Sequence, residues 1–62
     1  MEEIVKILMR RDGLSKSEAK NFLDDVMNEI EDAIASGNWE DAEDIWIGEV
    51  GLEVDYLMEV LM

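Results

Sequence analysis

The sequence predicts an all-α protein, a compact bundle of four helices over about residues 2–11, 16–36, 39–50 and 54–61. Apolar residues recur every three or four positions in these segments, which is the period of amphipathic helices. Short turns that contain glycine separate the segments, and the chain has no Pro. A chain of 62 residues is the size of one small domain, so residues 1–62 are expected to form a single acidic helical domain.

The first predicted helix covers residues 2–11. Its apolar side chains share one side at helical spacing, and they are Ile4, Val5, Ile7 and Leu8. Arg10 and Arg11 lie in the last turn, where cations interact favourably with the negative end of the helix dipole. Gly13 suits the left-handed position that commonly follows a helix, so the helix should end just before it.

The second predicted helix, over residues 16–36, is the longest and should be the spine of the fold. Ser15 and Glu18 have the spacing of a capping box, in which each side chain binds the backbone N–H of the other residue. Gly37 marks the end of the helix. Its apolar side is formed by Ala19, Phe22, Leu23, Val26, Met27, Ile30, Ala33 and Ile34.

Two shorter helices follow, over residues 39–50 and 54–61. Asn38 is a good N-cap residue for the third helix, and Gly51 should end it. The apolar side of the third helix is formed by Trp39, Ala42, Trp46 and Val50. In the fourth helix, the residues expected to face inward are Val54, Leu57, Met58 and Leu61.

Charge is distributed very unevenly along the chain. Residues 1–20 contain five bases and four acids, whereas residues 21–62 contain thirteen acids and no base, and the net charge is −12. The acidic segment would repel nucleic acid and anionic membranes, which excludes both as its direct ligands. The charge favours a basic protein surface as the partner.

Several kinds of chemistry lack the residues that they need. Without His or Cys, the chain cannot form nucleophilic triads, Cys–His pairs or histidine-based metal sites, and its glycines match no phosphate-binding loop. The acids match no EF-hand loop. We therefore expect no enzyme, no cofactor and no specific metal site. The absence of Cys, of a signal peptide and of a membrane span predicts a cytoplasmic protein.

The exposed acids are the first candidate binding surface. Asp25, Glu29 and Asp32 follow one another along the second helix with rises of about 6 and about 4.5 Å. Phosphates along a DNA strand are about 3.4 Å apart in rise, so such carboxylates can imitate a phosphate backbone. The alternative is a solvated face that keeps a small protein soluble, but solubility does not require the loss of every base after residue 20. The candidate partner-binding residues are Asp24, Asp25, Glu29, Glu31, Asp32, Glu40, Asp41 and Asp44.

Apolar residues of the third helix are the second candidate surface. Trp39 and Trp46 are seven positions apart and share one side, where they form either the core or the anchors of an interface. Ile47 lies off this apolar side, which indicates a contact with a partner or with a second copy. A second copy could also bind the basic residues Arg10, Arg11, Lys16 and Lys20. These features favour an alternative function, a small structural, assembly or regulatory protein that acts through an apolar homodimer or partner interface.

Three segments together resemble small acidic proteins encoded by bacteriophages and prophages. They are DGLSKSEA at 12–19, GNWEDAEDI at 37–45 and GLEVDYL at 51–57. Many such phage proteins inhibit host defences, as anti-CRISPR and anti-restriction proteins do. The resemblance implies an inhibitor in the cytoplasm of a bacterial host. Its acidic face would act as a DNA mimic that blocks a basic nucleic-acid-binding protein.

Overall fold

The computed structural model describes residues 2–62, which form four helices and contain no strand. The elements are α1 (Glu2–Asp12), α2 (Lys16–Ala35), α3 (Trp39–Ile45) with its π-helical continuation η1 (Trp46–Val50), and α4 (Val54–Leu61). The predicted all-α bundle is confirmed, and helix boundaries differ from the predicted ones by one residue at the ends of the first two helices.

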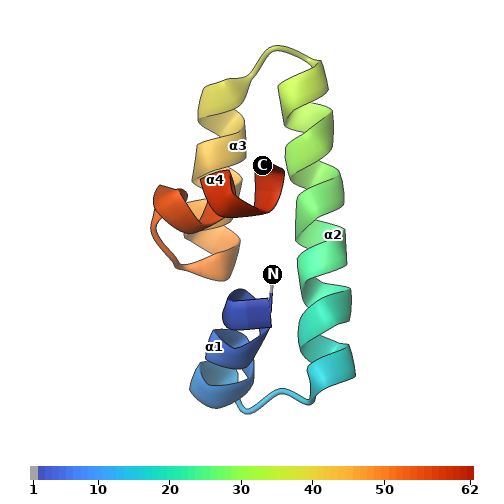
Figure 1. Cartoon of the computed structure of the whole chain (residues 1–62). Coiled ribbons are helices and arrows are strands. Elements are labelled where there is room, and N and C mark those ends of the chain that lie inside the picture. The colour runs from blue at the N-terminus through green and yellow to red at the C-terminus, as the bar shows by residue number, and fades with distance from the viewer. Residues whose placement is uncertain (1) are drawn as a thin grey trace.

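The long helix α2 is the spine of the bundle, as predicted (Figure 1). α1 packs beside the N-terminal half of α2, and α3 runs back along its C-terminal half. α4 then folds across α3 and η1, so that its last turn reaches the middle of α2. All four helices thus meet around one core.

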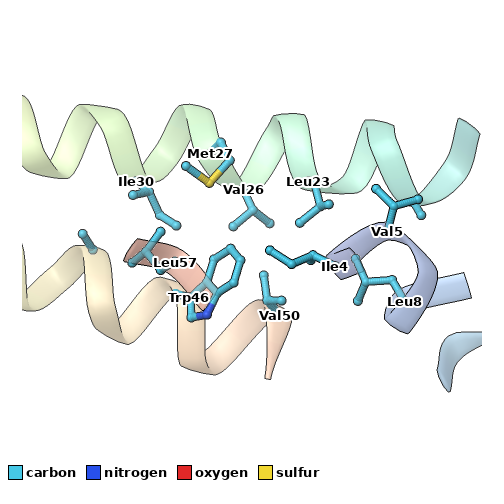
Figure 2. Packing of buried hydrophobic residues seen from close by; sticks show 12 residues of the cluster. Ile4, Val5, Leu8, Leu23, Val26, Met27, Ile30, Trp46, Val50 and Leu57 are labelled. Carbon is cyan, nitrogen blue, oxygen red and sulfur yellow. The ribbon is translucent and has the colours of Figure 1, made fainter. Parts of the chain in front are cut away.

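The core contains only hydrophobic side chains, contributed by every helix (Figure 2). Trp46 is its largest member and is 0% exposed. Trp46 is therefore a core residue and not an interface anchor, because a side chain without exposed surface cannot contact a partner. The other large side chains that are fully buried are Ile4, Leu8, Leu23, Ile30, Val50 and Leu57.

The joint before α2 forms as predicted. The Glu18 N–H donates to Ser15 Oγ at 3.2 Å, and the Ser15 N–H donates to Glu18 Oε1 at 2.9 Å, which completes the capping box. These bonds satisfy two backbone donors that the start of a helix otherwise leaves without partners. The direction in which α2 leaves the turn is therefore specified locally.

The joint after α2 differs from the prediction at Asn38. The Asn38 N–H donates to the Ala33 carbonyl at 2.8 Å and the Gly37 N–H to Ile34 at 2.9 Å, with Gly37 at φ +78°. This is a Schellman ending, which satisfies the last carbonyls of α2 and ends the helix at Ala35. The Asn38 side chain forms no capping hydrogen bond with α3. Asn38 therefore closes the preceding helix and also occupies the predicted N-cap position of α3, where its carbonyl accepts from the Ala42 N–H at 3.2 Å.

The predicted helix over 39–50 is α-helical only as far as Ile45. Residues 46–50 form a wider π turn, which ends where the Gly51 N–H donates to the Trp46 carbonyl at 3.1 Å. Gly51 is left-handed, at φ +76°. Beyond it, the Trp46 Nε1–H donates to the Glu53 carbonyl at 2.9 Å, which ties the π turn to the start of α4.

Candidate protein-binding surface

The eight acidic candidate residues all lie on the surface, and none has a cation as a partner within residues 2–62. The only ion pair within residues 2–62 joins Arg11 to Asp12 at 3.0 Å. Hydrogen bonding between these two side chains lowers the pKa of Asp12. Every carboxylate after Lys20 is consequently free of ion pairs in this part of the chain.

The acids of α2 do not form a single row. Asp24 and Glu31 are seven residues apart and line the side of α2 next to the end of α4. Asp25, Glu29 and Asp32 project from the other flank of the helix, on the side of Phe22 and Ala33, because they lie about 80–140° around the helix from Asp24 at ~100° per residue. The row expected from these three residues therefore stays on one flank, apart from Asp24 and Glu31.

The second flank of α2 gains an acid that sequence spacing did not indicate. Glu49 of η1 lies beside Glu29, and the pKa of Glu49 is raised by a hydrogen bond between the two carboxyl groups, by desolvation and by the negative charge of Glu29. The two residues are far apart in sequence, so only the packing of η1 against α2 brings them together. This pair concentrates negative charge at the junction of the two helices.

The acids of α3 face away from those of α2. Ala42 and Trp46 turn toward the core shared with α2, which leaves Glu40, Asp41 and Asp44 on the outer side of α3. Ile47 is 54% exposed and follows Asp44 by three residues, about one helical turn. The molecule therefore carries acidic residues on the outer sides of both α2 and α3.

The exposed apolar residues are also distributed over more than one side. Trp39 is 39% exposed and lines a shallow hollow at the start of α3 together with Asn38 and Asp41. Met58 and Leu61, which were expected to face inward, are 44% and 37% exposed. That expectation was wrong because α4 is apolar on more sides than the core can cover, and Leu57 occupies the buried position.

A groove between α2 and α4 has a volume of about 550 Å³. Met27, Val60 and Leu61 supply its apolar part, and Asp24 and Glu31 stand at its edge together with Asn28. Sequence analysis placed Asp24 and Glu31 among the binding residues but missed the groove, because its other wall comes from a helix about thirty residues later in the chain.

Residues 2–62 contain neither a cluster of metal ligands nor a membrane span. No three carboxylates there are arranged to share a metal ion. None of the helices in this range is both long enough and apolar enough to cross a bilayer. The surface features that stand out are the acidic ones described above.

Comparison of the chain with family models, with curated proteins and with solved structures finds no match in any of the three. Function is therefore argued from the charges, grooves and exposed side chains of the molecule itself.

Proposed function

We propose that this chain is a non-enzymatic inhibitor that binds a basic, nucleic-acid-binding protein of a bacterial host and thereby blocks it. It needs no cofactor and acts in the host cytoplasm, as phage-encoded anti-CRISPR or anti-restriction proteins of the DNA-mimic type do. The observation that carries the proposal is the set of thirteen acids after Lys20, none of which forms an ion pair within residues 2–62. Carboxylates left free in this way are available for Arg and Lys of another molecule.

Charge of this size also acts at a distance. A net charge of −12 on a molecule 33 Å long creates a strong negative field around the acidic helices. Such a field speeds the encounter with a positively charged groove and repels nucleic acid that competes for it. Binding of this kind weakens steeply when salt is added, because salt screens the charges of both partners.

The test is capture of partners followed by competition with DNA. The tagged chain is incubated with nuclease-treated bacterial lysate at about 0.1 M and about 1 M salt, where the Debye length is ~10 and ~3 Å. We expect basic proteins to be retained only at the lower concentration. Each captured protein is then titrated with a fluorescent DNA duplex, and addition of the chain should displace the duplex. Retention that is equal at both concentrations, or DNA binding that the chain does not affect, would refute the proposal.

A variant with Lys16 and Lys20 replaced by Gln is the matched control for a variant with Asp25 and Asp32 replaced by Asn. Each pair changes two charges on exposed positions of α2, so both should fold normally. The Asn variant should bind the captured protein more weakly, because it removes attraction. The Gln variant should bind at least as tightly, because it removes repulsion.

A second candidate function is a structural, assembly or regulatory role through apolar contacts with another chain or a second copy. The exposure of Ile47, about one helical turn after Asp44, favours it, because a large apolar side chain there contributes nothing to the core. This function predicts binding that salt hardly changes and that Ile47→Asp abolishes. Sedimentation of the purified protein distinguishes a homodimer from a monomer that binds other chains.

A further inference from the structure

We propose that the groove between α2 and α4 is a docking site for one amphipathic, basic helix of the partner protein. The inference rests on the proposed function, and it specifies which surface is used and what the partner places there. The groove has room for a row of side chains, at about 550 Å³. It lies where the last turn of α4, with Val60 and Leu61, meets the middle of α2.

The floor of the groove is apolar, so a docked helix would place apolar side chains against it. Met27 forms its base and is only 8% exposed, while Val60 and Leu61 line the α4 side. Met58 is also exposed on α4. Methionine is unbranched and adapts its shape to different apolar partners, so a floor that includes it accepts side chains of several sizes. An amphipathic helix would insert residues at i, i+3, i+4 and i+7 here.

The edge of the groove is acidic, so a docked helix would place positive charge beside it. Asp24 and Glu31 lie on the same side of α2, about 10 Å apart along its axis, which is two turns of a helix. Neither forms an ion pair within residues 2–62. Lys20 precedes Asp24 by one turn on α2, but it is not part of the groove. Lys or Arg residues that flank the apolar side of a docked helix would therefore meet these carboxylates.

The same charges argue against a second copy of the chain as the occupant. Two copies joined groove to groove would bring Asp24 and Glu31 of one against those of the other, at a net charge of −12 each. The one helix of this chain rich in bases is α1, and its apolar residues Ile4, Val5 and Leu8 are already buried in the core. A different protein with a basic amphipathic helix supplies both the apolar side chains for the floor of the groove and the positive charge for its edge.

The test uses a synthetic peptide of about four helical turns, built only from Leu and Lys, with Leu at i, i+3, i+4 and i+7. Binding is measured by fluorescence anisotropy, and a peptide of the same composition without an apolar side is the control. We expect the amphipathic peptide to bind about tenfold more tightly than the control peptide. In NMR spectra of the labelled protein, the resonances of Asn28, Val60 and Leu61 should shift. Equal affinity for the two peptides would overturn the inference.

Three variants locate the binding site. Leu61→Asp should weaken binding of the amphipathic peptide about tenfold, and the double variant D24N/E31Q about fivefold. The matched control is D41N/D44N, which removes two charges from the outer side of α3 and should change the affinity less than twofold. All these positions are exposed, and circular dichroism verifies that helicity is retained.

The results of these experiments distinguish a failure of the groove proposal from a failure of the proposed function. If D24N/E31Q and D41N/D44N weaken binding equally while Leu61→Asp has no effect, the peptide is held by diffuse charge, and the groove is refuted although an acidic inhibitor is not. If neither peptide binds, the groove is refuted as well, and the DNA-displacement assay decides independently whether the chain inhibits a basic protein. Loss confined to the groove variants supports the inference.

Discussion

Replacement of Trp46 by Phe tests the contact that holds α4 against the rest of the molecule. The indole of Trp46 is completely buried, and its Nε1–H donates to the Glu53 carbonyl at 2.9 Å. Phe keeps an aromatic ring in the core but removes this donor and makes the side chain smaller. The Glu53 carbonyl then loses its partner at the point where the chain enters α4.

The expected decrease in the free energy of unfolding follows from the lost hydrogen bond and from the smaller side chain. A partly buried carbonyl that loses its hydrogen bond costs about 1–3 kcal/mol, and the space left by the smaller ring adds about 1 kcal/mol. The sum of about 2–4 kcal/mol compares with a total free energy of unfolding of about 3–9 kcal/mol for 62 residues. The melting temperature should therefore fall by roughly 15–30 °C.

The control is the same substitution at Trp39, seven residues earlier. Trp39 is 39% exposed, and none of the side-chain hydrogen bonds within residues 2–62 involves it. Trp39→Phe should change the free energy of unfolding by less than about 0.5 kcal/mol. Urea titrations followed by far-UV circular dichroism measure both variants. Equal losses at the two positions would refute the assignment of a special role to the Trp46–Glu53 hydrogen bond.

Three other substitutions test the local chemistry of η1 and its C-cap. Gly51→Ala should destabilise the protein by about 1–2 kcal/mol in thermal unfolding, because Gly51 is left-handed and a Cβ there would lie 3.2 Å from Arg11 Nη1. Gly48→Ala should stabilise it by up to about 1 kcal/mol, since a Cβ there meets nothing within 4 Å, and similar effects at the two glycines would contradict this reasoning. Glu49→Gln should raise the urea midpoint at about pH 7, because Glu29 raises the pKa of Glu49 and the ionised carboxylate therefore opposes folding. This gain in the urea midpoint should shrink as the pH falls through the pKa of Glu49 in the folded protein, and it should vanish below the unfolded pKa of about 4.3. An undiminished gain at about pH 3 would be inconsistent with a raised pKa.

Most of the fold could be predicted because its signals are local. The apolar period indicates the four helices, and the Ser15–Glu18 capping box and Gly37 determine where α2 begins and ends. The π turn could not be predicted, since its pattern of apolar residues is nearly that of an α-helix. Asn38 lies at the predicted N-cap position of α3, but its side chain forms no capping hydrogen bond, and its backbone N–H completes the Schellman motif of α2, a use that its side-chain preference does not reveal.

The binding surface was less predictable, because it depends on how the helices pack. Helical spacing correctly placed all eight acidic candidates on the surface. It could not show that α2 and α3 turn their acids in different directions, nor that Glu49 would lie beside Glu29. The exposure of Met58 and Leu61 was missed for the same reason, since an apolar side of a helix is buried only where another element covers it.

The position of the bases explains why the carboxylates are free. All five Lys and Arg residues lie in the first twenty residues, in α1 and the first turns of α2. The twenty residues of α2 span about 30 Å, which is several times the Debye length of about 8 Å at physiological salt. Cations at one end of this helix therefore cannot neutralise acids at the other end. In the proposed mode of binding, that separation would let the acidic helices attract a basic partner over a distance, and the apolar floor between α2 and α4 would select, at contact, a partner with an amphipathic helix.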